Sequence, residues 1–127
     1  MTATDRAVEL TRAAAAAAAD KLAADVVAFD VSDQLAITDV FLIASGSSPR
    51  QVGAVKDAVE EALIAMGAKP IRREGEREAQ WVLLDFGEIV VHVQHAEMRA
   101  YYALERLWSD CPVIPLDDVI ADGRVDD

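Results

Sequence analysis

The sequence predicts a single α/β domain with a mixed β-sheet and flanking helices. The 127-residue length suits one domain. Helical and strand-like patterns alternate in the order helix, two strands, helix, three strands, helix and a short last strand. The Gly87-Glu88 turn joins two strands as a hairpin, which requires an antiparallel pair. With no repeat and no linker in sight, we expect one domain over residues 1–116 and an acidic, flexible tail over 117–127.

The N-terminal third contains a predicted helix and two predicted strands. Thr2 or Thr4 can cap a helix over about residues 3–24, which contains a run of seven alanines with maximal helix propensity. The short β-branched segment 26–29 predicts a strand. The near-continuous apolar run over 39–44 predicts a second strand that is buried on both faces.

The clearest local signal is the start of the next helix. Ser48 stands at the N-cap, Pro49 at the first helical position and Gln51 three residues after the cap. This arrangement combines a capping box with the preference for proline at the first turn. Apolar residues then recur at helical spacing up to Met66, and Gly67 ends the helix. We therefore predict a helix over residues 49–66.

The remaining predicted elements follow from periodicity and from breaker residues. Pro70 restricts its strand to an edge of the sheet, and Cys111-Pro112 ends the last helix. The predictions are an edge strand over 69–73, a polar loop over 74–80, strands over 81–86 and 89–94, a helix over 95–109 and a short strand over 113–116.

The two-residue hairpin turn predicts the register of its strands, and with it the two faces. One face is entirely apolar and is predicted to be core, with Phe86 opposite Ile89, Leu84 opposite Val91 and Val82 opposite Val93. The other face is mixed, with Asp85 opposite Val90, Leu83 opposite His92 and Trp81 opposite Gln94. Apolar bulk among scattered polar groups is typical of partner-binding surfaces. In the alternative, a helix covers Trp81 and Leu83 and leaves the polar residues at the rim.

The predicted helix over 95–109 divides in the same way. Its inward stripe is Ala100, Ala103, Leu104 and Leu107, flanked by Tyr101 and Trp108. Met98, Tyr102 and Glu105 fall on the opposite side and extend the candidate interface.

Composition limits the classes of partner and the cellular compartment. The chain has 12 Lys and Arg against 23 Asp and Glu, a net charge of −11, which disfavours phosphate backbones and anionic membranes and favours a basic partner. The lone Cys111 allows no intrachain disulfide and indicates a reducing compartment, most simply the cytoplasm. No apolar run approaches the roughly 18 residues of a membrane span.

The residues favour a binding module over an enzyme. The Gly46-Ser47 turn before a helix could cradle a phosphate, but it matches neither a P-loop nor a dinucleotide fingerprint. A two-metal nucleotidyltransferase would need an Asp-x-Asp pair downstream, whereas Asp57 is followed two residues later by Val59. His92 and His95 point to opposite faces and are poorly placed to share a metal. We expect no cofactor and no catalytic residue, and the alternative is a nucleotide-binding or nucleotidyltransferase enzyme that uses the Gly46-Ser47 turn.

Four segments of this sequence resemble the ribosomal silencing factor (Iojap-like) family. They are DVFLIASGSSPRQ over 39–51, Glu74-Gly75, WVLLDFGEIVVH over 81–92 and RAYYALERLW over 99–108. The resemblance extends in order and spacing over about residues 5–116, and Phe86 stands where the family usually has tyrosine.

The resemblance implies a fold and a function. The implied fold is nucleotidyltransferase-like without the catalytic acids. The implied function is translational repression by binding the large ribosomal subunit at ribosomal protein L14, which blocks joining of the small subunit under nutrient limitation. It also implies a homodimer in the free state. The acidic charge and the absence of a long apolar run separately lead us to expect no membrane partner and no direct sequence-specific nucleic-acid contact.

Carried onto this chain, the family's contact region covers the mixed hairpin face and the following helix. Asp85 and Glu105 would meet basic residues of the partner, and Arg99 would pair with one of them. The register points Phe86 inward, and Tyr101 lies at the edge of the inward stripe. The candidate partner-binding residues are Trp81, Leu83, Asp85, Phe86, His92, Met98, Tyr101, Tyr102 and Glu105.

Overall fold

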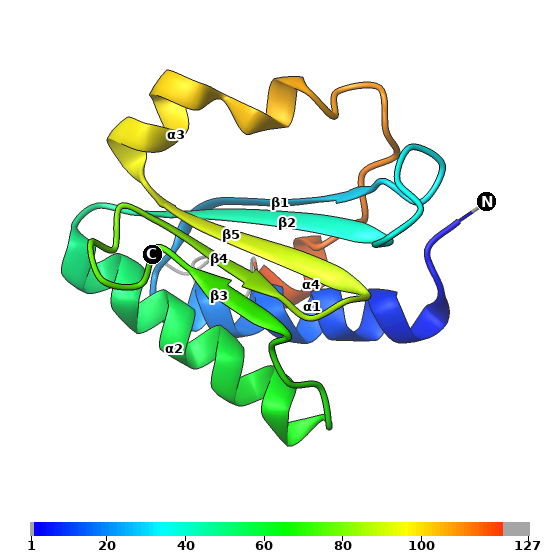
Figure 1. The fold of residues 1–127 in the computed structure, drawn as a ribbon, viewed down its shortest axis with the longest axis horizontal. Helices are drawn as coiled ribbons and strands as arrows, with labels where there is room; N and C mark the ends of the chain where they lie inside the picture. The colour runs from blue at the N-terminus through cyan, green and yellow to red at the C-terminus, as the bar shows by residue number, and fades with distance from the viewer. Residues whose placement is uncertain (1, 121–127) are drawn as a thin grey trace.

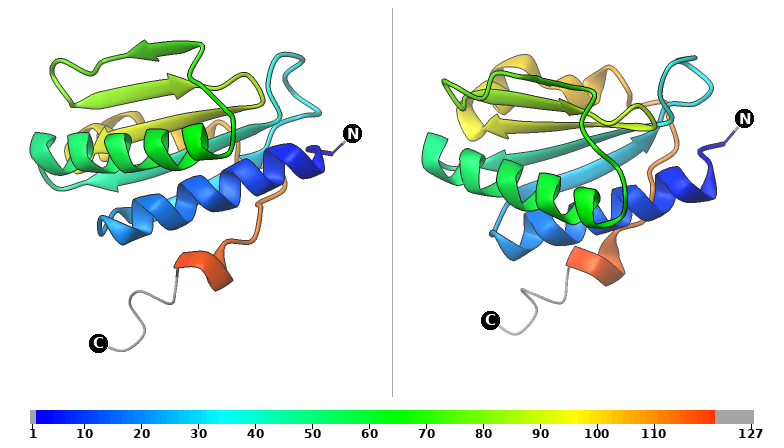
Figure 2. Two further views of the ribbon diagram at one scale, coloured as in Figure 1. Left: turned by 90° about the horizontal axis from the view of Figure 1, so that it is seen from below. Right: turned by 60° about the horizontal axis from the view of Figure 1, so that its bottom comes forward.

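A five-stranded sheet with helices on both faces makes up the described part of the chain, residues 2–120 of this computed structural model (Figure 1). In chain order the elements are α1 (Asp5–Asp20), β1 (Ala24–Asp30), β2 (Val40–Gly46), α2 (Pro49–Ala65), β3 (Arg72–Glu74), β4 (Trp81–Asp85), β5 (Ile89–His95), α3 (Ala96–Tyr102), the 3-10 helix η1 (Leu104–Arg106) and α4 (Asp117–Ile120). Figure 2 shows α1 and α2 side by side across one face of the sheet.

The sheet is mixed, as the sequence predicts. Its strand order is β1-β2-β5-β4-β3, with β2 and β5 parallel and the other neighbours antiparallel. The short strand β3 lies at the edge, and it begins at Arg72 because the chain turns at the preceding Pro70-Ile71. The β4–β5 register agrees with the prediction, with Leu84 opposite Val91 and Leu83 opposite His92.

Local capping explains the ends of α2. The Ser48 hydroxyl accepts a hydrogen bond from the Gln51 N–H at 3.1 Å, so the predicted N-cap is confirmed. The Gln51 side chain accepts the N–H of Ser47 rather than that of Ser48, which makes a variant of the predicted capping box. At the other end Gly67 takes a left-handed φ of +87°, and the N–H of Ala68 bonds to the Leu63 carbonyl.

The main core lies between the sheet and the α1–α2 layer. All six residues of the predicted apolar hairpin face are buried there, together with the inner faces of both helices. Thr4 caps α1, and this helix ends at Asp20, earlier than predicted, because Leu22 adopts a left-handed conformation with φ of 63°. Small buried alanines on α1, such as Ala14 and Ala18, let the helix backbone approach the sheet closely.

Two predictions in the C-terminal third are wrong. The predicted helix over 95–109 breaks at Ala103, whose φ of +46° is left-handed, so a seven-residue α3 is followed by η1. The predicted inward stripe is only partly inward, since Leu104 packs half-buried against the cluster around Ile43 whereas Ala100 is exposed and Leu107 is 70% exposed. The predicted strand over 113–116 is a single bridge between Val113 and Phe29, because the prolines on either side lack N–H donors.

Residues 117–120 form α4, which packs on α1. Val119 and Ile120 contact the main core, and Asp118 forms an ion pair with Arg12. The rest of the predicted acidic tail, residues 121–127, lies outside the described residues. Among the helices of residues 2–120, none combines the length and apolarity that a membrane span requires.

Candidate binding surface

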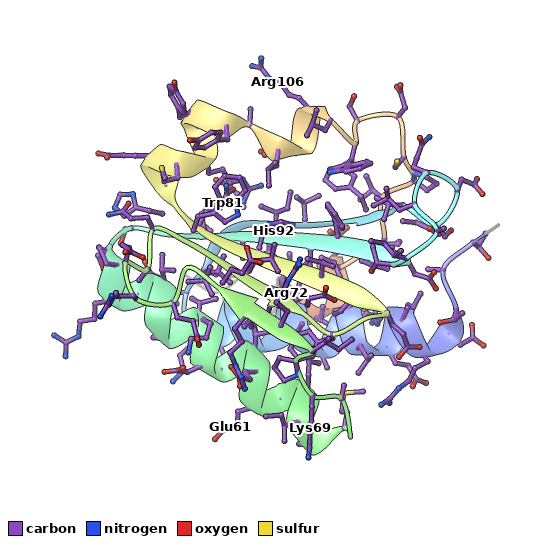
Figure 3. All side chains as sticks on the ribbon, in the orientation of Figure 1. Glu61, Lys69, Arg72, Trp81, His92 and Arg106 are labelled. Atoms are coloured by element: carbon purple, nitrogen blue, oxygen red, sulfur yellow. The ribbon has the colours of Figure 1, made fainter. Side chains whose placement is uncertain are left out.

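The sheet face opposite α1 and α2 carries a group of aromatic side chains. The Trp81 indole N–H donates to Nδ1 of His92 at 3.1 Å, and the Trp81 ring lies 5.0 Å from the ring of Tyr102 on α3. Tyr101 stacks edge-on against Tyr102 at 4.9 Å. Figure 3 shows Trp81 and His92 between the sheet and α3. Strand β4 and helix α3, separated by a full strand in sequence, are thereby joined by ring contacts.

Part of this group is open to solvent. Tyr101 is 80% exposed and Tyr102 is 49% exposed, while Trp81 and Leu83 are half-buried. A hollow beside them is lined by Glu74, Gly75, Trp81 and Leu83. We call Trp81, Leu83, Tyr101 and Tyr102 the aromatic surface. Exposed aromatic rings beside a hollow are the features that anchor protein partners.

A segment that sequence reasoning treated only as a polar loop positions Trp81. Gly75 has φ of +80°, and a Cβ at this position would lie 2.0 Å from the Trp81 carbonyl oxygen. Only glycine fits so close an approach. Lys56 on α2 pairs with Glu76 at 2.8 Å, which ties this loop to the helix layer. The Glu74-Gly75 pair in the sequence was the available signal for this role.

The candidate acidic residues already have partners within the chain. Asp85 accepts the N–H of Gly87 at 2.8 Å and lies 3.9 Å from the Arg72 guanidinium. Glu105 pairs with Nε of Arg99 at 3.1 Å, which decides between the two partners proposed for Arg99. Arg99 itself is only 8% exposed and also donates to the buried Ser45 hydroxyl at 2.9 Å. The predicted apolar stripe gave no sign of this buried arginine.

Two of the sequence-predicted partner residues offer little surface. Phe86 is 7% exposed and belongs to the core between the sheet and α1–α2. His92 is 5% exposed, and Figure 3 shows it beneath residues 96–110, which we call the cover. Burial lowers the pKa of His92 to about 4. Met98 on α3 is half-buried.

The structure partly satisfies each of the two interpretations of the mixed hairpin face. The cover does lie over this face, as the alternative required. However, it buries the polar His92 and Gln94 and leaves the apolar Trp81 and Leu83 at the rim, the reverse of the expected order. The apolar rim is therefore the part that a partner can reach.

The turn considered for phosphate binding is occupied by its own side chains. The N–H and hydroxyl of Ser47 both donate to Oε1 of Gln51, at 2.7 and 2.9 Å. The Gln51 amide in turn donates to the carbonyls of Lys21 and Leu22, so it joins two turns of the fold. Within residues 2–120, no three His, Cys, Asp or Glu side chains lie close enough to hold a metal ion. This geometry serves structure and gives no support to phosphate chemistry.

Comparison with known proteins identifies the family. Residues 4–126 match the family model described as "Ribosomal silencing factor during starvation". The chain is 42% identical over 113 residues to the ribosomal silencing factor of Halalkalibacterium halodurans, covering 89% of this chain and 97% of the relative. It is also 42% identical over 108 residues to that of Bacillus subtilis, covering 85% and 92%.

A solved structure agrees with these sequence matches. The crystal structure of protein CV0518 from Chromobacterium violaceum superposes with a TM-score of 0.77 at 34% identity, covering 80% of this chain and 84% of that one. A family model that spans nearly the whole chain, relatives at more than 40% identity and a shared fold all lead to one conclusion. The chain belongs to the ribosomal silencing factor family.

Proposed function

We propose that this protein represses translation by binding the large ribosomal subunit and preventing the small subunit from joining it. Family membership supports the association with the ribosome, and the description of the matching family refers to starvation. The proposed contact is ribosomal protein L14, on the face where the small subunit docks. The observation that carries this proposal is the aromatic surface, because it offers exposed rings for a protein partner and no reactive group.

The charge of the chain supports a contact with protein rather than with RNA. A net charge of −11 repels ribosomal RNA phosphates and attracts a basic ribosomal protein. Tyr101 and the half-buried Trp81 would be the anchors, since hot spots concentrate in aromatic residues. Asp85 and Glu105 would lie at the periphery of the interface with the partner. Their charges are already partly neutralised by Arg72 and Arg99. The free energy of binding would therefore come mainly from the rings.

The proposed mechanism is steric and involves no chemical step. A folded domain held at an intersubunit contact excludes the small subunit by its volume, and we propose that the protein is not an enzyme. We further propose that it acts in the cytoplasm, that it is a homodimer when free and that residues 1–116 form the silencing domain. The relatives named as ribosomal silencing factors support the cytoplasmic assignment.

Co-sedimentation with purified large subunits tests the proposed surface. Tyr101→Ala changes a side chain that is 80% exposed, so the fold should be unaffected. We expect Tyr101→Ala and Trp81→Ala each to weaken binding by about 2 kcal/mol, roughly 30-fold. Ile37→Ala is the control matched to Tyr101→Ala, because Ile37 is a similarly exposed apolar residue on the loop between β1 and β2.

The same gradients test the mechanism. The wild-type protein should comigrate with free large subunits and be absent from joined ribosomes. Adding it to separated subunits should lower the fraction that joins, and Tyr101→Ala should restore joining. Folded Trp81→Ala and Tyr101→Ala variants that comigrate as fully as the wild type would refute the assignment of the surface.

A further inference from the structure

The cover, residues 96–110, is attached to the rest of the protein at two fixed points. At its start the His95 N–H donates to the Gln80 carbonyl at 2.8 Å. At its end the Pro112 carbonyl accepts the N–H of Asp30 at 2.8 Å. Between these points Ala103 adopts a left-handed conformation, so the chain changes direction between α3 and η1. The cover is thus fixed to the rest of the protein at both of its ends.

One buried polar residue and two ring contacts attach the cover to the sheet along its length. The ring contacts are Tyr102 with Trp81 and Trp108 with Phe41, each with 5.0 Å between ring centroids. Among residues 96–110, all of them described, only Arg99 is buried. It bonds Ser45 of β2 and Glu105 of η1, so it joins α3, η1 and the sheet. Leu104 and Trp108 are only half-buried against the small cluster around Ile43. A seven-residue helix with no buried apolar side chain has little stability of its own.

Polar atoms between the cover and the sheet are left without hydrogen bonds from the protein. Within the described chain, five buried side-chain atoms have no hydrogen-bond partner from the protein itself: Nε2 of His92, both amide atoms of Gln94, Oε1 of Glu105 and Nε1 of Trp108. His92 and Gln94 are on the sheet face that the cover overlies, and Glu105 and Trp108 belong to the cover. Buried unpaired polar groups disfavour the closed arrangement relative to one that water can enter.

We propose that the cover opens and closes as a hinged unit over an intact sheet, and that Arg99 is the positioning residue that holds it closed. The aromatic surface has one half on the cover, Tyr101 and Tyr102, and the other half on β4, Trp81 and Leu83. Closing therefore assembles this surface, and opening separates its halves. This last consequence rests on the proposed function, whereas the opening itself does not.

The two histidines allow opening to be measured on the free protein. Diethyl pyrocarbonate modifies imidazoles that solvent can reach, and mass spectrometry separates the sites. His95 is half-buried and serves as the internal reference for the 5% exposed His92. Amide hydrogen exchange in α2 measures how often the whole protein unfolds. We expect His92 to react at least tenfold faster than global unfolding at that frequency would allow. Amides of the cover should exchange through the same opening. Reaction of His92 and exchange of the cover only at the global rate would overturn the proposal.

Variants test the role of Arg99. Arg99→Ala removes both hydrogen bonds, and Ser45→Ala removes one of them with a smaller risk to folding. Each should raise the His92 reaction rate severalfold while α2 amides keep their protection, a split that a merely structural role would not produce. Arg99→Lys, which can restore one bond, should fall between Ala and wild type. The control is Arg106→Ala, because Arg106 is exposed and points away from the sheet (Figure 3). Equal rates of His92 modification in Ser45→Ala, Arg99→Ala and Arg106→Ala would refute the positioning role of Arg99.

Binding distinguishes this proposal from the proposed function. If the cover assembles the surface, Ser45→Ala should weaken co-sedimentation in proportion to its open fraction. Faster His92 labelling with unchanged binding would overturn the assembly step. A wild-type protein whose cover opens as described but which never comigrates with large subunits would refute the proposed function. The proposal that the cover opens would not be affected.

Discussion

Lowering the pH from 7 to 5 should destabilise this protein through one buried histidine. His92 is 5% exposed, and the Trp81 indole N–H donates to its Nδ1, which requires that nitrogen to be unprotonated. Burial lowers the pKa of His92 from 6.5 to about 4. The native state therefore holds His92 neutral at pH values where the unfolded chain protonates it.

The sign and the size of the effect follow from this pKa difference. Because the native pKa of His92 is the lower one, its contribution to stability is complete above pH 6.5 and is lost as the pH falls toward 4. Each pH unit within that window costs about 1.36 kcal/mol, so the loss by pH 5 is about 2 kcal/mol. Aspartate and glutamate titrate mostly below about pH 5, so the upper part of the window reports His92.

Urea unfolding at pH 7, 6 and 5 measures this loss. The wild type should lose about 2 kcal/mol of unfolding free energy across the series. His92→Gln should lose much less, because it removes the titrating ring. NMR titration of the His92 ring gives its pKa directly. A pKa of 6 or above, or equal losses in wild type and His92→Gln, would refute the reasoning.

Substitutions at three further positions test other parts of the structure. Gly75→Ala should lower the unfolding free energy measured in urea by more than about 2 kcal/mol and should perturb Trp81 fluorescence, because the added Cβ would lie 2.0 Å from the Trp81 carbonyl oxygen. A Gly75→Ala variant as stable as the wild type would contradict this geometry. Ser48→Ala should cost about 1 kcal/mol in the same assay by removing the α2 cap, and Ser48→Asp should retain most of it. Asp85→Lys should slow association with large subunits severalfold at low salt, with Asp85→Asn intermediate; unchanged stopped-flow rates would exclude a steering role.

Much of the fold could be predicted because its signals are local. The cap at Ser48, the stop at Gly67 and the two-residue turn at Gly87 each depend on residues within a few positions of one another. The interactions that stabilise these features are therefore local and can be recognised from the sequence. The hairpin register followed from the turn alone, and it correctly separated a core face from a mixed face.

The C-terminal third could not be predicted in this way. Its apolar periodicity favoured one long helix, but the helix breaks at the left-handed Ala103, and Arg99 bonds Ser45 on the sheet and Glu105 beyond the break. Ser45 is 54 positions away from Arg99, so no local pattern contains that interaction. The same holds for the turn occupied by Gln51, whose partners at Lys21 and Leu22 lie in the turn that follows α1.

By itself, the sequence determined the fold class, the family resemblance, the acidic charge and the residues that share a face with Trp81. Those properties depend on composition, on short motifs and on the two-residue repeat by which side chains alternate along a strand. Only the tertiary structure decided which of these residues a partner can reach. Packing of the cover against β2 and β5 buries His92 while it leaves Tyr101 exposed, and core packing removes Phe86 from the surface. Exposure depends on contacts between segments that are distant in sequence, and these exist only in the folded chain.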